Sequence, residues 1–378
     1  MAGETVLIAA FSGRALAQSA RRAGFVPLVV DAFGDADTRN AAAHYAHLPD
    51  AIRLGFRGKP LRATCDRLIA ESGTTPIGIV LGSGFEDRPK LIDALAQTYG
   101  LLGTKADTVA EVKDPAAFFP LLKQLGIAHP ETSLTPPADP QGWIAKRRGA
   151  AGGAHIRLAS PERKFGSRYY FQRRLPGIPM SILAMVGPGG MAFEFSRQWT
   201  APSARRPFRY GGAVSISYAE TPAHDAMVRT TALLIELLDP VGLVSFDFIV
   251  DGETPYLLEM NPRPGATLDI FDDATGSLFK AHIDAGRGQR LTPRSEEPDR
   301  TAHARAAALL YAPQATTIAH ELDWPSWVAD RPMAGAIIPA EAPLATVKAD
   351  GATDADAEHL VRARLAELDN LIYRHKKP

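Results

Sequence analysis

The first hundred residues alternate between short apolar runs and segments with helical spacing, and this alternation constrains the fold more than any other feature of the chain. The apolar runs have the length of strands and lie at residues 5–10, 25–30 and 77–81. The helical segments lie at 13–23, 61–72 and 89–99. Strands that alternate with helices predict a parallel sheet with helices on both faces. Ligands of such sheets bind beyond the carboxyl ends of the strands, which are here 11–14, 31–39 and 82–88.

Length and composition narrow the class of protein. A chain of 378 residues is too long for one ordinary core, so about two to four domains are expected. The hydrophobic share of 46% and the charged share of 22% are typical of a globular protein. The formal net charge of zero argues against a general binder of nucleic acids or acidic membranes. Cys65 is the single cysteine, so neither an internal disulfide nor a thiol metal cluster can form.

The amino-terminal residues predict the compartment. They carry neither a basic region nor a long apolar run, so no signal peptide is expected. No apolar stretch in the sequence approaches the roughly 20 residues that span a bilayer. Together these features predict a cytoplasmic protein.

The character of the sequence changes after residue 110. Asp114 and Pro115 begin a helix that runs to about residue 125, because proline is favoured at the first helical position. A proline-rich connector follows at 130–140. Residues 143–260 are a region of strands and glycine loops, which a long helix at 222–238 interrupts. The last segments are a strand-rich region at 301–349, an amphipathic helix at 354–370 and a solvated basic tail at 374–377.

A hairpin over residues 245–261 is predicted to gather polar side chains on one face. Asp251 and Gly252 form a strong turn signal between two strands. Side chains alternate between faces along a strand. The even positions are apolar or aromatic, namely Phe246, Phe248, Val250, Tyr256, Leu258 and Met260. The odd positions Asp247, Glu259 and Asn261 are therefore expected to share the opposite face.

Two carboxylates and an amide on one face suit a hard cation. Mg²⁺ typically takes one or two carboxylates together with substrate phosphates. The alternative is an ordinary hairpin with a polar outer face. Arg263 follows between two prolines, where a fixed guanidinium could hold an oxyanion. Its alternative role is that of a structural arginine that balances Glu259.

A glycine loop follows a predicted strand that ends at Lys146. Gly149, Gly152 and Gly153 lie in this loop. Glycines let backbone N–H groups approach phosphate oxygens closely, and Lys146 would supply a positive charge. The loop is not a Walker motif, which requires Gly-x-x-x-x-Gly-Lys-Ser/Thr before a helix. A flexible hairpin tip would show the same sequence features.

The order of these parts resembles the ATP-grasp superfamily over roughly residues 5–288. The first two parts are Lys113, before a helix, and Lys146, on a strand that a glycine loop follows. The other parts are a Gln-x-x-Leu-Pro-Gly hinge that begins at Gln172, a strand with Asp247, and a Glu-x-Asn-Pro-Arg run that begins at Glu259. Three further segments, 31–39, 82–86 and 112–115, are similar to a subfamily of carboxylate–amine ligases. That subfamily includes the tyramine–glutamate ligase of methanofuran synthesis and relatives linked to methanopterin-type cofactors.

The resemblance implies an α/β architecture in four parts. A Rossmann-like domain with a parallel sheet would come first. Two α+β subdomains that clamp ATP would follow, and a small strand-rich extension would complete the chain. The corresponding boundaries are 1–110, 111–176, 177–290 and 291–378.

The resemblance also implies roles for individual residues. Those expected at ATP are Lys113, Lys146, Gly149, Gly152, Gly153, Gln172, Arg173 and Leu175. Those expected to hold two Mg²⁺ or Mn²⁺ ions are Asp247, Glu259 and Asn261. Those expected at the substrate are Arg14, Ser83, Glu86, Tyr210, Gly211 and Arg263. Arg263 and Lys146 would act in catalysis. Pro179 and Ser245 depart from the family pattern, because they replace an acidic ribose ligand and an arginine.

The implied reaction joins a carboxylate to an amine through an acyl phosphate. The suggested pair is glutamate with tyramine or tyrosine, in the biosynthesis of a one-carbon cofactor. The alternatives are a carboxylase that uses bicarbonate and a non-catalytic nucleotide-binding scaffold. The expected partners are small molecules rather than nucleic acids or membranes, and a homodimer is compatible with the resemblance.

Other motifs give weaker predictions. His44 and His47 would face one side of a helix, but they lack the third ligand of a zinc site. Asp31 ends a strand as a dinucleotide-binding acid would, yet the preceding loop lacks Gly-x-Gly-x-x-Gly, which argues against NAD. Arg14 is either a substrate contact or a solvated residue at a helix start. Residues 210–215 are either a mobile substrate loop or the start of a strand.

Overall fold

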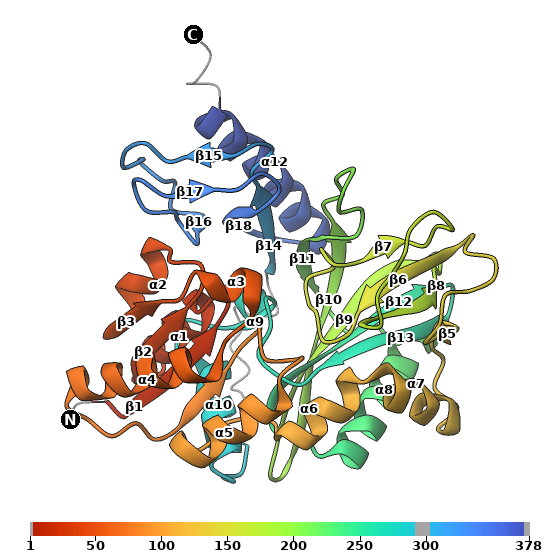
Figure 1. The fold of residues 1–378 in the computed structure, drawn as a ribbon, viewed down its shortest axis with the longest axis horizontal. Coiled ribbons are helices and arrows are strands. Elements are labelled where there is room, and N and C mark those ends of the chain that lie inside the picture. The colour runs from red at the N-terminus through yellow and green to blue at the C-terminus, as the bar shows by residue number, and fades with distance from the viewer. Residues whose placement is uncertain (1–2, 292–302, 374–378) are drawn as a thin grey trace.

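A computed structural model describes residues 3–291 and 303–373 (Figure 1). The predicted basic tail at 374–377 lies outside these residues. None of the helices among them combines the length and the apolar character needed to cross a membrane.

The amino-terminal domain is built on a parallel sheet with the strand order β3-β2-β1-β4. The strands are β1 (Thr5–Ala10), β2 (Val26–Asp31), β3 (His44–His47) and β4 (Ile79–Leu81). The helices are α1 (Arg14–Arg22), α2 (Ala36–Ala41), α3 (Asp50–Leu54), α4 (Gly58–Ser72) and α5 (Pro89–Tyr99). Val6 and Leu7 belong to different buried clusters, one on each side of the sheet. Leu16 of α1 belongs to the first cluster and Leu61 of α4 to the second, so the predicted parallel sheet with helices on both faces is confirmed.

The prediction that His44 and His47 share one side of a helix is wrong. They are the first and last residues of β3, which pairs in parallel with β2. Residues three apart in a strand point to opposite faces, so the two imidazoles diverge. His44 lies 3.9 Å from Glu71, whereas His47 Nε2 contacts the Ala32 carbonyl at 3.1 Å. Pairing with a neighbouring strand has outweighed the local helical pattern.

A small unit follows, with two helices and an antiparallel sheet. The helices are α6 (Ala106–Lys113) and α7 (Pro115–Gln124). The sheet has the order β5-β8-β6-β7, with β5 (Thr132–Ser133), β8 (Tyr169–Arg173), β6 (Trp143–Arg147) and β7 (Arg157–Leu158). The Asp114 carboxylate accepts a hydrogen bond from Ala116 N at 3.1 Å, and Pro115 occupies the first turn. These two residues start α7, as predicted.

The large sheet forms the centre of the molecule, with the order β13-β12-β9-β10-β11-β14-β18-β16. Five of its strands are β9 (Ile178–Gly187), β10 (Gly190–Thr200), β11 (Tyr210–Ile216), β12 (Gly242–Asp251) and β13 (Thr254–Asn261). Helix α8 (Pro222–Leu238) covers one face, where Met227 packs in one cluster with Phe246. Helix α10 (Ser277–Gly286) covers the other face, where Phe279 belongs to the cluster that also holds Val6 of the amino-terminal domain.

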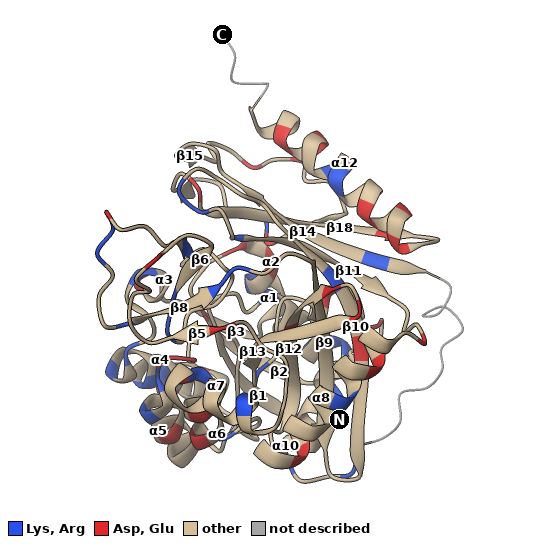
Figure 2. Cartoon of the chain, turned by 90° about the vertical axis from the view of Figure 1, so that its right-hand side faces the viewer, with Lys and Arg blue, Asp and Glu red and all other residues tan. Residues whose placement is uncertain are grey.

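The carboxyl-terminal residues extend the large sheet. Strands β14 (Ala304–Tyr311), β18 (Pro343–Gly351) and β16 (Val328–Ala329) continue it beyond β11, and β15 (Thr316–Thr317) pairs with β17 (Ile337–Ile338). Helices α9 (Leu268–Phe271) and α12 (Asp354–Tyr373) complete the fold. Arg197 of β10 pairs with Asp354 at 2.9 Å, so α12 is tied to the sheet. Figure 2 shows charges of both signs along α12 and α5, in agreement with the zero net charge.

Candidate active site

The Asp247 cluster, which we define as Asp247, Glu259 and Asn261, lies on one face of the β12–β13 hairpin. Asp247 pairs with Glu259 across the two strands, and Ser245 pairs with Asn261. The Asn261 amide donates from Nδ2 to Asp247 Oδ2 at 2.9 Å and to Glu259 Oε1 at 3.3 Å. Cross-strand pairing therefore brings two carboxylates and an amide into direct contact.

The opposite face of the hairpin differs from the prediction on β13. The register shifts between Asp247 and Phe248, so Phe248 pairs with Leu257 rather than with Leu258. As a result Leu257 is fully buried, whereas Leu258 and Tyr256 are only half-buried. The physical reason is a β-bulge, which inserts one extra residue into β13 and reverses the alternation of the residues beyond it.

The pKa values of the two carboxyl groups of the cluster are shifted in opposite directions by their surroundings. Burial and the Glu259 charge raise the pKa of Asp247. Burial also disfavours ionised Glu259, but Lys113 and Lys146 outweigh it and lower the pKa of this carboxyl group. A divalent cation would relieve the repulsion between the carboxylates, so the donor set fits one. Among residues 3–291 and 303–373, no three His, Cys, Asp or Glu side chains could hold a metal by themselves, so phosphate oxygens would have to complete the coordination.

Two lysines converge on this cluster from different elements. Lys113, the last residue of α6, donates from Nζ to Asn261 Oδ1 at 2.6 Å and lies 3.6 Å from Glu259 Oε2. Lys146 of β6 is buried and donates to Gln172 Oε1 at 3.1 Å. Burial lowers the pKa of Lys146, but Tyr170 and Glu259 outweigh burial and raise it. Lys146 is therefore held as a cation, and the side chain of Lys113 lies beside Glu259 and Asn261.

The glycine loop between β6 and β7 is fixed by close contacts. Gly149 has φ +62°, and a Cβ atom there would lie 2.6 Å from Asp87 Cβ. Gly153 has φ +69°, and a Cβ atom there would lie 2.0 Å from the Phe208 carbonyl oxygen. The Gly152 carbonyl accepts a hydrogen bond from Tyr210 N at 3.0 Å. Only glycine allows this conformation and this approach, so the loop is seated against the amino-terminal domain and β11.

The predicted hinge residues lie in different surroundings. Gln172 is buried, and its Nε2 donates to Thr132 Oγ1 at 3.1 Å. Arg173 is exposed, with its guanidinium 5.4 Å from the Trp143 ring centroid. Leu175 is half-buried in the turn that follows β8. The side chain of Gln172 therefore orients Lys146, and those of Arg173 and Leu175 lie nearer the surface.

Arg263 is bound by the amino-terminal domain rather than by Glu259. Its Nε donates to Glu86 Oε1 at 2.7 Å, and Glu86 Oε2 accepts a hydrogen bond from Gly84 N at 2.7 Å. Burial disfavours ionised Glu86, but Arg263 and Lys113 outweigh it and lower its pKa. The backbone carbonyl of the neighbouring Ser83 accepts a hydrogen bond from Phe11 N at 2.9 Å. The alternative in which Arg263 balances Glu259 is therefore wrong, because a buried carboxylate lies closer.

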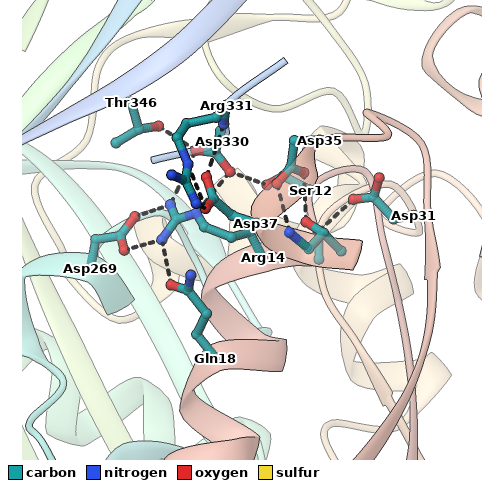
Figure 3. A network of polar contacts seen from close by, with 12 residues as sticks. Ser12, Arg14, Gln18, Asp31, Asp35, Asp37, Asp269, Asp330, Arg331 and Thr346 are labelled. Atoms are coloured by element: carbon teal, nitrogen blue, oxygen red, sulfur yellow. Dashed lines mark hydrogen bonds and ion pairs between the residues drawn. The ribbon is translucent and has the colours of Figure 1, made fainter. Parts of the chain in front are cut away.

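Arg14 is the centre of a buried polar network (Figure 3). It is 2% exposed and donates to both carboxylate oxygens of Asp269 and, from Nε at 2.8 Å, to Asp330 Oδ1. Asp31, at the end of β2, is also buried and accepts from Gly13 N at 2.7 Å. The alternative of a solvated Arg14 is wrong, because two acidic residues distant in sequence enclose it. Its guanidinium links α1, α9 and the carboxyl-terminal region.

Tyr210 and Gly211 begin strand β11, so the alternative of a mobile loop is wrong and the strand start is confirmed. Tyr311 Oη donates to the Tyr210 carbonyl at 2.7 Å. A Cβ atom on Gly211 would lie 2.7 Å from the Thr200 carbonyl carbon. Pairing with β10 and close packing fix this segment. Burial raises the pKa of the Tyr210 hydroxyl.

Two residues near the cluster were not predicted. Gln198 of β10 donates from Nε2 to Asp247 Oδ1 at 3.2 Å. Near Gln198 in β10, polar residues occur at even and at odd positions, so the alternation of side chains between the two faces could not have distinguished it. His155 lies in the glycine loop and lines one cavity with Lys113 and Glu259. The sequence signal that could have identified His155 is its position two residues after Gly153, within the predicted glycine loop.

Comparison with known proteins identifies the central domain. Residues 110–267 match the ATP-grasp domain family. The chain contains an ATP-grasp domain. The carbamoyl phosphate synthase large chain of Clostridium acetobutylicum is 32% identical over 68 residues, which are 18% of this chain and 6% of that protein. The resemblance predicted from the ordered motifs is thus confirmed for the ATP-grasp domain.

Solved structures with similar folds cover nearly the whole chain. Rhizobium etli pyruvate carboxylase has a TM-score of 0.71 at 16% identity, over 98% of this chain and 39% of that chain. An L-amino acid ligase from Bacillus licheniformis has a TM-score of 0.70 at 13% identity, over 98% of both chains. These likenesses confirm the predicted α/β ATP-grasp architecture. This chain spans less than half the length of the carboxylase and a small part of the carbamoyl phosphate synthase.

Proposed function

We propose that this chain is an ATP-dependent ligase that joins a carboxylate to an amine through an acyl phosphate. The observation that carries the proposal is the meeting of Lys113 with Asn261 and Glu259, within 2.6 Å and 3.6 Å, inside an ATP-grasp domain. Such a grouping of ammonium and carboxylate charges suits the metal-bound phosphates of a nucleotide. The similar fold of an L-amino acid ligase over 98% of both chains supports carbon–nitrogen ligation.

The nucleotide would lie between the two ATP-grasp sheets. Lys113 and Lys146 would bind its phosphates, beneath the loop that carries Gly149, Gly152 and Gly153. The segment from Gln172 to Leu175 would lie against the adenine. When bound, Mg²⁺ or Mn²⁺ ions on the Asp247 cluster would neutralise charge on the transferring phosphoryl group. Coordination by Asn261 Oδ1 requires Lys113 to exchange its present contact for a phosphate oxygen.

In the first step an oxygen of the substrate carboxylate attacks the γ-phosphorus of ATP. The bond between that phosphorus and the bridging oxygen breaks, and its electron pair leaves with ADP. Arg263 would hold the carboxylate in line with the phosphate, because its guanidinium is already oriented by Glu86. The lysines would offset the negative charge that the phosphoryl oxygens carry.

In the second step the amine nitrogen attacks the acyl carbon. The carbon–oxygen bond to phosphate breaks, inorganic phosphate leaves with the electron pair, and the nitrogen loses a proton. The glycine loop, seated on Asp87 and Phe208, would keep water from the acyl phosphate. No protein nucleophile is needed.

The subfamily resemblance supports glutamate as the carboxylate and tyramine or tyrosine as the amine, in the synthesis of a one-carbon cofactor. The rival substrate is bicarbonate, which the similar fold of a pyruvate carboxylase favours. The second rival is a scaffold that binds nucleotide without turnover.

An ADP-release assay distinguishes these functions. The purified chain is incubated with ATP, Mg²⁺ or Mn²⁺, and each pair from a panel of carboxylates and amines, with and without bicarbonate. The proposal predicts ADP release that requires both a carboxylate and an amine, and an amide product by mass spectrometry. Release that depends on bicarbonate alone would favour a carboxylase. Nucleotide binding without ADP release under any condition would favour the scaffold.

A further inference from the structure

His155 lies in the glycine loop between β6 and β7, at a position that no role has yet explained. The imidazole lines a cavity together with Gly149 of the same loop and with Lys113, Tyr170 and Glu259 from other parts of the chain. Two of these residues, Lys113 and Glu259, belong to the proposed phosphate and metal site. A loop residue therefore shares its cavity with that site.

The imidazole has an unused hydrogen-bonding atom. His155 Nδ1 is shielded from solvent and makes no hydrogen bond of normal geometry among residues 3–291 and 303–373, although the Ala151 backbone interacts with the ring and acts to raise its pKa. Buried polar atoms in folded proteins are nearly always paired, since an unpaired one loses its contacts with water without compensation. A side chain that served only to pack the loop would have no need of a nitrogen at this position. The unpaired atom is thus available to a ligand that enters the cavity.

The backbone around His155 is held in place. Gly149 packs on Asp87, and the Gly152 carbonyl accepts from Tyr210 N at 3.0 Å. Ile156 N donates to the Gly153 carbonyl at 3.0 Å, in a tight turn around the histidine. These contacts with two domains position the imidazole before any nucleotide arrives.

The charges around His155 favour an anion. Burial and the Lys146 ammonium lower the pKa of the imidazole to about 4. Arg147 also lowers this pKa, whereas the Glu259 carboxylate acts to raise it. Lys113 lines the same cavity. A positive potential of this kind attracts phosphate oxygens, which are strong hydrogen-bond acceptors.

We propose that Nδ1 of His155 donates a hydrogen bond to the terminal phosphoryl group of ATP. This inference rests on the proposed use of ATP, but not on the identity of the carboxylate or the amine. His155 would then help Lys113 and Lys146 to distinguish ATP from ADP.

Binding measurements on the full chain test this role without turnover. Isothermal titration calorimetry would compare the β,γ-imido analogue of ATP with ADP, both with Mg²⁺. In His155→Ala we expect affinity for the analogue to fall by about 10- to 100-fold, the usual effect of one hydrogen bond to a charged group. Affinity for ADP should change by less than about threefold. His44→Ala, a histidine on β3 with a different neighbour, is the control and should bind both nucleotides normally.

Two further variants separate the hydrogen bond from the shape of the loop. The amide of His155→Asn reaches the position of Nδ1, whereas that of His155→Gln reaches the position of Nε2. We expect the asparagine variant to retain the preference for the analogue over ADP and the glutamine variant to lose it. Equal losses for the analogue and ADP in all three variants, or no loss in any, would overturn the role of His155. A wild-type chain that binds neither nucleotide would instead overturn the proposed function, and this inference with it.

Discussion

The guanidinium of Arg263 donates from Nε to Oε1 of Glu86 across 2.7 Å, and thereby ties the segment after β13 to the amino-terminal domain. Both side chains are largely buried, at 14% and 5% exposure. Glu86 is also fixed by the backbone amide of Gly84. The orientation of the proposed substrate arginine is therefore set by a domain outside the ATP-grasp match.

Replacement of Glu86 by Gln should impair this orientation. The amide keeps the shape of the carboxylate but removes its charge, so Arg263 is held less firmly. We expect kcat to fall by about 10- to 100-fold, while KM for ATP changes by less than about threefold, because a misplaced positioning group affects the reaction more than nucleotide binding. Steady-state kinetics would measure both. Asp93→Asn, an exposed acid of α5, is the control and should have wild-type values.

Replacement of Glu259 by Gln should abolish turnover and leave the fold intact. Glu259 has contacts with Asn261 and Lys113, and removal of its charge weakens the proposed metal site. ADP release should drop by at least about a thousandfold, and Mn²⁺ binding in the presence of ADP, followed by electron paramagnetic resonance, should weaken. Glu253→Gln in the exposed turn of the same hairpin should match the wild type. Full activity in Glu259→Gln would refute the metal role.

Replacement of Arg14 by Ala should destabilise the protein strongly. The change leaves the carboxylates of Asp269 and Asp330 without their shared cation in a largely buried site. Removal of one partner of such a pair typically costs about 3–5 kcal/mol in the free energy of unfolding. Urea unfolding would measure it. Arg21→Ala, exposed on the same helix, should stay within about 0.5 kcal/mol of the wild type.

Replacement of Asp35 by Asn should stabilise the protein at high pH. Burial and the Asp330 carboxylate raise the pKa of Asp35 to about 7. The folded chain therefore holds a proton that the unfolded chain releases, and stability falls as pH rises from about 4 to about 7. The amide can still accept the bond from Thr38 N and cannot ionise. Urea unfolding should show a gain of about 1–4 kcal/mol at pH 8 that vanishes near pH 4. An equal gain at both pH values would contradict this explanation.

Replacement of Gly149 by Ala should displace the glycine loop. Its φ is +62°, and the added Cβ would lie 2.6 Å from Asp87 Cβ. Gly152 is the matched control, since its φ is similar at +73° but a Cβ there meets nothing within 4 Å. Both alanine variants carry backbone strain, so the difference between them reports the contact with Asp87. We expect nucleotide affinity to fall about tenfold further in Gly149→Ala. Equal affinities would show that the contact does not position the loop.

Local periodicity in the sequence was sufficient to predict many of the regular elements, although it placed the residues of β3 in a helix. The apolar run Thr5–Ala10 and the helix Pro222–Leu238 have the predicted bounds, because strand and helix spacing are properties of neighbouring residues. Alternation along the hairpin was likewise enough to assign Asp247 and Glu259 to one face, since they lie on the same side of the bulge. The ordered motifs also identified the ATP-grasp domain.

Only the tertiary structure decided which side chains face those motifs. The bulge after Asp247 reversed the burial of Leu257 and Leu258, because register depends on both strands and their neighbours. Glu86 and Arg263 are 177 residues apart, and Arg14 and Asp330 are 316 apart. No local pattern links such residues, because their contact arises from the packing of separate domains. The sequence by itself determined many of the elements and the chemical character of the site, whereas packing between strands and domains determined the partners of the site residues.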